Sequence, residues 1–310
     1  MNDQILDSNI VGEAAALATS CLWTITSLFF TSAGKRIGSL SVNAYRTVIA
    51  VGFLAVAHLI VLGTVVPLAN SAQWFWMGAS GIVGLVIGDG GLFAAYITIG
   101  PRRAVLVMAL APIFAILGAY LMLGEVIAQL ALVGIAVTLT GVIVVILEAE
   151  EHSGEIVVSK NLRAYGLLFA LIGAAGQGIG LVLSKKGIDL VSGTTLNPLS
   201  ATLMRLILAA SSIWLVLLVA GKWPQLRGAV RSREGISNVA MGAFLGPFLG
   251  ITLSMVAVTY TQTGIAQTLM SLMPVLIIPT VWIRYGQKTS WRGILGAAIA
   301  VIGVAMLFLS

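Results

Sequence analysis

The chain has 310 residues, of which 59% are apolar and only 9% are charged. Soluble domains carry about 45–50% apolar and about 25% charged residues, so this chain has too few polar side chains to cover a surface that faces water. The chain has 17 basic and 11 acidic residues. In a membrane protein, what matters is where the basic residues lie relative to the apolar segments, so this excess does not indicate a nucleic-acid partner. A single cysteine, Cys21, excludes an intramolecular disulfide. The composition predicts a protein that crosses a bilayer many times.

Ten apolar segments are long enough to cross the membrane as helices, which takes about 20 residues each. They are residues 10–33, 41–63, 74–98, 104–123, 126–147, 164–184, 198–220, 237–260, 264–283 and 291–309. A polar stretch at 149–163 separates five segments from five. The sequence thus predicts an all-α protein with ten transmembrane helices, divided into a first repeat at 1–148, a linker at 149–163 and a second repeat at 164–310.

The two halves match each other at a nearly constant separation, which indicates an internal duplication. The matched pairs are Pro112 with Pro274, Gly134 with Gly296 and Gly141 with Gly303 at 162 residues, Met77 with Met241 and Tyr96 with Tyr260 at 164, and Arg46 with Arg205 at 159. Because each copy has an odd number of spans, the second copy enters the membrane from the opposite side. Such inverted repeats are found in many secondary transporters, with the substrate site near the midplane.

Several short motifs resemble the ten-helix, EamA-type branch of the drug/metabolite transporter superfamily. They are Asn43-Ala44-Tyr45-Arg46, Leu110-Ala111-Pro112-Ile113-Phe114, Leu123-Gly124-Glu125, Arg205, Met273-Pro274-Val275 and Gly286. The second copy departs from the family pattern at Gln287, where the family often keeps Glu. The resemblance implies export or exchange of small metabolites, amino acids or drugs, driven by an ion gradient or by a counter-substrate.

Asp89 is read as the only acid well inside a span, about 15 Å from the nearer end at 1.5 Å per residue. An acid at that depth is costly and usually faces a partner or a polar site. One interpretation is a proton-coupling carboxylate or the counter-ion of a substrate amine. The other is a structural ion pair with Arg46, which lies early in the second span. A separation of 164 residues places Leu253 opposite Asp89, so the acid is predicted to be absent from the second copy.

Arg46 and Arg205 occur in both copies, so we expect them to share a role. A structural charge near a helix end is the first interpretation, and binding of an anionic group is the second. Pro112 and Pro274 interrupt the helical hydrogen bonds at equivalent positions and are predicted to kink spans four and nine, as gates beside the site. His58 is read as a packing residue with its hydrogen bonds satisfied, and Glu125 as a cap or ion-pair partner at the start of span five.

Aromatic and amide side chains are the candidates for substrate contact, because they supply hydrogen bonds and ring faces inside an apolar pocket. They lie on helices that line the cavity in the resembled family. These residues are Trp23, Thr24, Ser27, Tyr96, Gln177, Tyr260, Gln267 and Ser271. For Tyr96 and Tyr260 the alternative is an interfacial belt position near a span end. Small-residue pairs such as Gly84/Gly88 and Gly176/Gly180 predict close helix packing in spans three, six and eight.

No Cys/His cluster, phosphate loop or HExxH motif occurs in the sequence, so we expect no metal site, no cofactor and no enzyme activity. The predicted partners are a small-molecule solute and the lipid bilayer, with protons as a candidate coupling ion and no nucleic acid. The predicted location is the cell (inner) membrane. An intramembrane enzyme and a passive channel remain the alternatives to a secondary transporter.

The basic residues of the loops predict the orientation of the chain. Loops that follow odd-numbered spans carry 13 Lys and Arg, whereas loops that follow even-numbered spans carry only Lys185 and Lys186. The positive-inside rule then makes the 149–163 linker cytoplasmic and places both termini outside, opposite to what the resemblance implies. A reporter that is active only in the cytoplasm should be silent when it is fused after Ser310. Strong reporter activity would reverse the orientation while leaving the repeat intact.

Overall fold

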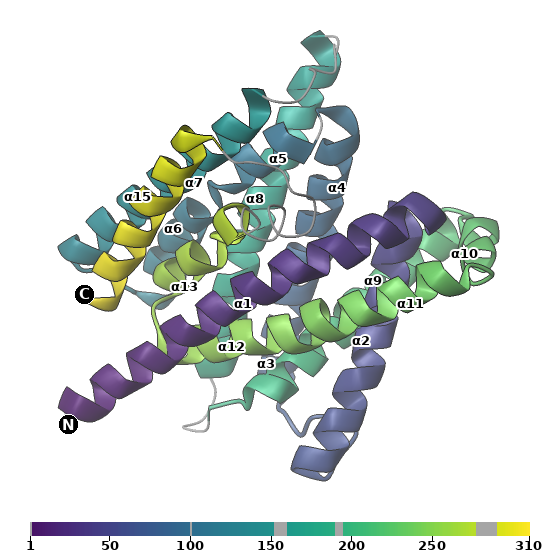
Figure 1. Cartoon of the computed structure of the whole chain (residues 1–310). Helices are drawn as coiled ribbons and strands as arrows, with labels where there is room; N and C mark the ends of the chain where they lie inside the picture. The colour runs from purple at the N-terminus through teal and green to yellow at the C-terminus, as the bar shows by residue number, and fades with distance from the viewer. Residues whose placement is uncertain (1, 100, 152–159, 190–194, 277–289) are drawn as a thin grey trace.

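The computed structural model describes residues 2–99, 101–151, 160–189, 195–276 and 290–310, and these ranges form helices joined by short connections (Figure 1). The helices of the first half are α1 (Asn2–Ile37), α2 (Ser39–Leu62), α3 (Ser71–Gly81), the π-helical segment η1 (Ile82–Gly88), α4 (Asp89–Thr98), α5 (Pro101–Met108), α6 (Ala111–Leu123) and α7 (Gln129–Glu151). Those of the second half are α8 (Lys160–Asp189), α9 (Pro198–Val219), α10 (Trp223–Ala229), α11 (Arg233–Ala243), η2 (Phe244–Gly250), α12 (Ile251–Tyr260), α13 (Thr263–Met270) and α15 (Trp291–Phe308).

Nine helical stretches in the described ranges are long and apolar enough to cross a membrane, and a shorter apolar helix covers Thr263–Leu276. They fall on the ten predicted segments; residues 277–283 of the ninth lie outside the described residues. The first helix is longer than predicted, because α1 begins at Asn2 and the prediction began at residue 10. Its helical backbone continues through polar residues, since a helix satisfies its own hydrogen bonds in water as well as in lipid.

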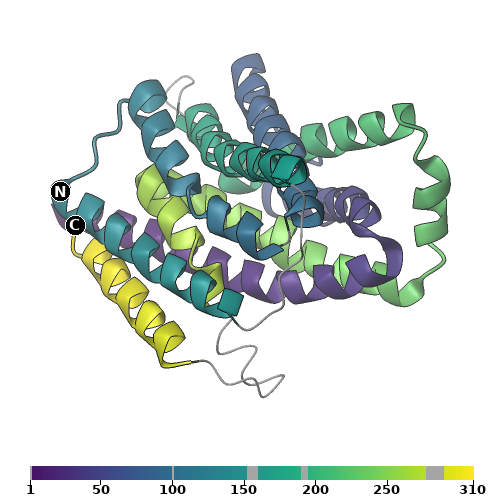
Figure 2. The ribbon, with the colours of Figure 1, turned by 90° about the horizontal axis from the view of Figure 1, so that it is seen from above.

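The two halves pack against each other in an exchanged manner. The first span, α1, lies along α11, η2 and α12 of the second half, and the sixth span, α8, lies along α3, η1 and α4 of the first half. The second spans of the two copies, α2 and α9, pack on one another, as do α7 and α15 (Figures 1 and 2). This pairing is what two inverted copies related by a pseudo-two-fold axis produce. The two ends of the chain lie on the same side of the molecule in both views, in keeping with an even number of crossings.

The glycines matched between the repeats lie in one interface. In α7 and α15, Gly134, Gly141, Gly296 and Gly303 face the opposite helix, and a Cβ added at Gly141 or Gly303 would collide with the backbone of Ala300 or Thr138. Small residues let membrane helices approach closely where no hydrophobic effect drives them together. The duplicated glycines therefore pair the last helices of the two repeats.

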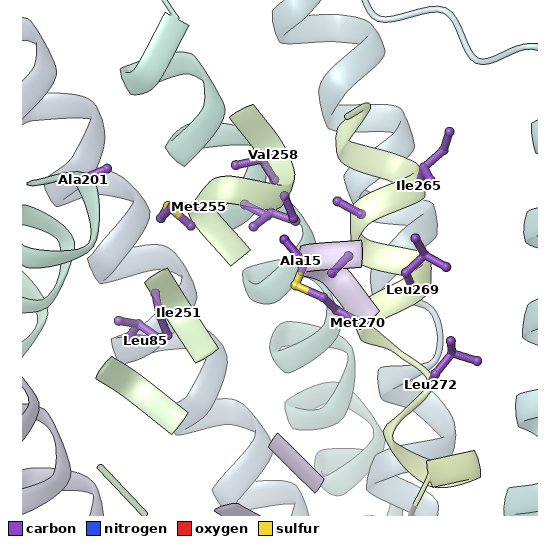
Figure 3. Close-up of a cluster of buried hydrophobic side chains, with 14 of the residues drawn as sticks. Ala15, Leu85, Ala201, Ile251, Met255, Val258, Ile265, Leu269, Met270 and Leu272 are labelled. Atoms are coloured by element: carbon purple, nitrogen blue, oxygen red, sulfur yellow. The ribbon is translucent and has the colours of Figure 1, made fainter. Parts of the chain in front are cut away.

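The interior contains many alanines beside Leu, Ile and Met, and large apolar side chains also cover the outside. Ala15, Leu85, Ala201, Ile251 and Met255 belong to one buried cluster that joins α1, η1, α9 and the eighth span (Figure 3). The outer surface carries exposed Ile60, Leu121 and Val219, with exposed fractions of 77%, 78% and 82%. Such a surface suits hydrocarbon chains rather than water.

Spans four and nine are broken at matching places. The helix stops at residues 109–110 between α5 and α6 and at 271–272 after α13, and Pro112 and Pro274 follow these breaks by the same number of residues. The local hydrogen bonds also match: Ile113 N–H donates to Leu110 O at 2.9 Å, and Val275 N–H donates to Leu272 O at 2.9 Å. The predicted interruptions are present, in the form of short breaks.

Candidate functional site

The two π-helical segments interrupt the third span of each repeat at equivalent positions. η1 and η2 are seven residues long and lie 162 residues apart, the same separation as Pro112 and Pro274. The first residue after η1 is Asp89 and the first after η2 is Ile251. The predicted register of 164, which placed Leu253 opposite Asp89, is therefore wrong by two residues. π-Helical turns are rare and are often found at functional sites.

Close contact between η1 and α8 brings the two repeats together beside Asp89. A Cβ added at Gly176 would lie 2.6 Å from the Cα of Gly88, so Gly176 has no room for a side chain, and a Cβ at Gly88 would be tight against Gly176 at 3.2 Å. Gly180 meets Gly84 in the same way. The predicted small-residue pairs of spans three and six thus form one interface. Because Gln177 follows Gly176, this contact places its amide next to the carboxylate at the end of η1.

The Asp89 carboxylate has two partners, one from each repeat. Its Oδ2 forms an ion pair with Nη2 of Arg46 on α2, and its Oδ1 accepts a hydrogen bond of 2.7 Å from Nε2 of Gln177 on α8. The two charged side chains are mostly buried, with 13% of Arg46 and 11% of Asp89 exposed. The structure therefore brings together three of the predicted site residues, and the two charges partly compensate each other within the membrane.

Arg46 is held by further contacts on its other sides. Its Nε donates to Oδ1 of Asn43 at 2.9 Å, one turn earlier in α2. The guanidinium carbon lies 5.6 Å from the ring centroid of Phe30 and 5.7 Å from that of Phe93. Aromatic faces attract a guanidinium, and the attraction increases when water is excluded. Asn43 and the two phenylalanines were not predicted as site residues.

Arg205, the counterpart of Arg46, occupies the second repeat near the same place. Arg46 and Arg205 are each seven residues from the start of their helix, and the inverted repeat brings these starts to opposite membrane faces. Only 3% of Arg205 is exposed, and it interacts electrostatically with Asp89. A Cβ added at Gly84 would lie 2.6 Å from its Nη2. We call Arg46, Asp89, Gln177 and Arg205 the central polar cluster.

Four further residues that were predicted to contact the substrate lie in α1 and α12. Trp23 packs on Gly250 at the end of η2, where a Cβ would meet its Nε1 at 2.7 Å. Thr24 and Ser27 donate to carbonyls of α1 itself, at 2.8 and 2.7 Å. Tyr260 is 45% exposed at the end of α12.

Other predicted residues are outside this centre. Gln267 is buried in α13, where its carbonyl accepts a 2.8 Å hydrogen bond from the Ser271 hydroxyl; α13 packs on α6 and α1. The side chain of Tyr96 and the residues Gly286 and Gln287 lie outside the described part of the chain.

One acid departs from the sequence interpretation and another agrees with one of its two alternatives. Glu13 is 5% exposed in α1, so Asp89 is not the only acid buried within a span; Glu13 lay inside the predicted span 10–33, close to its start. Glu125 forms an ion pair, as one of the two alternatives predicted, and it also bonds to the start of α13. Its Oε2 accepts from the backbone N–H of Thr263 at 2.8 Å, at the start of α13, and its Oε1 lies 2.8 Å from Nζ of Lys185. His58 has hydrogen-bond partners, including Ser200 Oγ at 2.9 Å, as expected for a satisfied packing residue.

Comparison with known proteins identifies the family. The sequence profile of the EamA-like transporter family matches residues 10–147 and again residues 164–309. The chain belongs to the EamA-like transporter family. It is thus a multi-pass membrane protein of a transporter family, of the drug/metabolite transporter type, with two EamA repeats. None of the curated proteins matches the chain.

Solved structures with this architecture are also known. One of them, described only as the crystal structure of a protein, superposes with a TM-score of 0.73 at 18% sequence identity and covers 98% of this chain and 96% of its own. At this identity the likeness concerns the fold alone. It extends over both repeats of the EamA protein, including the region of the central polar cluster.

The ion pair makes a prediction about stability. Asp89→Asn removes the charge that compensates Arg46, so the free energy of unfolding should fall by on the order of 3 kcal/mol. Adding Arg46→Leu removes the unpaired charge and should restore most of the loss. Thermal unfolding in detergent of the single and double variants measures both effects. Equal melting temperatures for the wild type and Asp89→Asn would mean that the pair contributes nothing to stability.

Proposed function

We propose that this EamA-family protein is a secondary transporter that exports or exchanges small organic solutes, such as amino acids or drug-like compounds, across the cell (inner) membrane. The observation that carries the proposal is the central polar cluster, where Arg46 and Asp89 of one repeat meet Gln177 of the other. Polar and charged groups are costly within a membrane and usually mark a substrate or ion pathway. A site made from both repeats changes its shape when the repeats move relative to one another.

A second polar cluster joins the repeats at the membrane face that carries the loops after even-numbered spans. We call it the even-face cluster. Glu125 follows α6, Lys185 lies near the end of α8, and Thr261 and Thr263 lie between the eighth and ninth spans. Besides its ion pair with Glu125, Lys185 donates to Thr261 O at 2.7 Å, and the Thr263 hydroxyl donates to Glu125 at 3.0 Å. Only 14% of Lys185 and 12% of Glu125 is exposed. These contacts must break before a pathway opens on this face.

The opposite face is also linked across the repeats, because Tyr45 Oη donates to Leu226 O at 3.0 Å and Asn238 Nδ2 donates to Ser32 Oγ at 3.2 Å. Its ion pair is the more exposed of the two. Arg36 and Glu234 form an ion pair there, but their side chains are 46% and 64% exposed. Exposed ion pairs contribute little because water and salt screen them, whereas a mostly buried pair with further hydrogen bonds is costly to break. The mostly buried Glu125–Lys185 pair supports a state closed at the even-loop face, which is one of the states that alternating access requires. The breaks before Pro112 and Pro274 supply points where α6 and the ninth span can pivot, in keeping with a gating role.

A flux experiment tests the function directly. Purified protein in liposomes should move at least one labelled amino acid or drug-like solute of a panel, with saturation and with faster exchange when unlabelled solute is on the other side. A passive channel predicts neither saturation nor counterflow, and an intramembrane enzyme predicts a chemically altered solute. Asp89→Asn should slow flux severalfold, because Arg46 and Gln177 lose their common partner. Gly90→Ala is the matched control, since a Cβ at Gly90 meets nothing within 4 Å.

The same liposomes test proton coupling through Asp89. Protonation of this carboxylate has to break its ion pair with Arg46, so coupling requires that the pair opens during transport. If Asp89 couples transport to protons, Asp89→Asn still exchanges solute but no longer responds to a pH gradient. An Asp89→Asn variant that is fully active and still responds to pH removes Asp89 from the mechanism.

The even-face cluster gives a separate prediction about access. Thr261 is 5% exposed, so a cysteine at this position should react slowly with a membrane-impermeant thiol reagent in a Cys21→Ser background. Lys185→Ala removes the cation that joins the repeats, and the labelling rate should rise about tenfold, which corresponds to about 1.4 kcal/mol. Arg36→Ala, on the opposite face, is the control and should leave the rate unchanged. Unaltered labelling in Lys185→Ala would show that this cluster does not close the pathway.

A further inference from the structure

The central polar cluster contains two cations and one anion. Of the 17 Lys and Arg residues, 13 belong to the predicted loops after odd-numbered spans and two to those after even-numbered spans, which leaves Arg46 and Arg205. Asp89 forms its ion pair with Arg46. Glu13, the other acid that is buried among the described residues, is elsewhere: its neighbour Gly12 packs against Tyr260 and Thr261 at the C-terminal end of α12. The cluster therefore carries an excess of one positive charge.

That excess is located at Arg205. Its Nε is buried and has no hydrogen-bond partner among the residues that the structure describes. Asp89 acts on the guanidinium through its charge, while the carboxylate oxygens bond to Arg46 and Gln177. A buried N–H of a cation that has no hydrogen bond lowers stability, because it has lost its hydration without gaining an acceptor. Its side chain can donate up to five hydrogen bonds.

Two glycines of the third span leave space for this arginine. Gly81 and Gly84 lie on the side of the third span that faces α9, and a Cβ at Gly81 would collide with the Arg205 carbonyl. At Gly84 the added Cβ would collide with the guanidinium itself. Gly84 also belongs to η1, and its carbonyl lies 3.5 Å from Nε2 of Gln177. Arg205 is thus adjacent to the groups that bind Asp89, at the enclosed end of the same polar cluster.

We propose that Arg205 binds a carboxylate group of the transported solute, so that the substrates of this protein are small monocarboxylates, amino acids included. The inference rests on the proposed transport function. The planar guanidinium presents paired N–H groups that match the two oxygens of a carboxylate. A single negative charge neutralises the excess charge of the cluster. The bound carboxylate supplies the acceptor that the described residues do not supply to the Nε of Arg205.

Binding is tested with purified full-length protein in detergent by thermal unfolding. The probes are simple monocarboxylates and amino acids, each matched with its own amide: propionate with propionamide, benzoate with benzamide, alanine with alaninamide and leucine with leucinamide. At least one acid should raise the melting temperature of the wild type while its amide does not. If no acid stabilises the wild type, or if the amides act equally well, the proposal is wrong.

Variants of Arg205 distinguish binding from a structural role. Arg205→Gln removes an unpaired buried charge, so without ligand its melting temperature should equal or exceed that of the wild type. The acid that stabilises the wild type should bind about 10- to 100-fold more weakly to it, which is the loss expected for hydrogen bonds to a charged group. Arg46→Gln is the matched control; it should lower stability, because Asp89 loses its ion pair. A less stable Arg205→Gln protein that still responds to acids would overturn the proposal.

Two milder variants keep the test decisive if Arg205→Gln does not fold. Arg205→Lys retains the charge but loses the planar fork, and Gly84→Ala displaces the guanidinium without changing any charge. Both should weaken stabilisation by the acid, whereas Gly90→Ala should not. Acid binding that is unchanged in Arg205→Lys and Gly84→Ala places the ligand elsewhere and rejects the proposal.

Flux measurements separate this proposal from the transport function on which it rests. If liposomes with the protein move only amines or neutral amides, transport stands and the carboxylate site does not. If an acid stabilises the protein through Arg205 but no solute of the panel is moved, the binding site stands and the transport function fails.

Discussion

Charged side chains inside a bilayer have to find partners within the protein, because the hydrocarbon offers neither water nor counter-ions. The centre of this protein is arranged around that constraint. Asp89 is compensated by Arg46, which in turn is held by Asn43 and by the rings of Phe30 and Phe93. The Gln177 amide reaches the same carboxylate from the other repeat. These contacts require that α2, η1 and α8 meet closely, and the glycines of η1 and α8 make that approach possible.

The two repeats share their backbone and differ in their chemistry. Both copies contain a π-helical segment, a break before a proline and an arginine early in the second span. The symmetry ends at the side chains: Ile251 occupies the place of Asp89, so two symmetric arginines share a single acid. A site with one acid in each repeat would present the same groups toward both membrane faces. With an acid in the first repeat and Ile251 in the second, the centre presents different groups toward the two faces. This difference also leaves Arg205 with no hydrogen-bonding partner for its Nε within the described residues.

The polar links between the repeats differ at the two membrane faces. Glu125 and Lys185 join the halves within a mostly buried network, whereas the Arg36–Glu234 pair is open to solvent. Between these faces, glycine pairs such as Gly88 with Gly176 let helices of the two repeats approach closely. Together with the breaks in spans four and nine, this distribution supports movement of one repeat against the other around the central polar cluster.

Hydropathy and internal matches were sufficient to predict the ten spans, the duplication and the inverted arrangement, because lipid demands long apolar helices and an odd repeat has to invert. The pairing of Asp89 with Arg46 was also within reach, since depth along a helix follows from residue number. The π-helical segments were not, because a single wider turn leaves no periodic signal. The register of 164 was taken from the Met77 and Tyr96 matches, and it misplaced Leu253 opposite Asp89. Glu13 lay inside the predicted first span but close to its start, so it was not counted among the acids well inside a span. Only tertiary packing decided which face of each helix turns inward. That choice brings Gln177 to Asp89, brings Glu125 to Lys185 and places Gly84 where it makes room for Arg205. The sequence could not predict it, because apolar side chains surround these helices on all sides and the membrane favours no particular rotation.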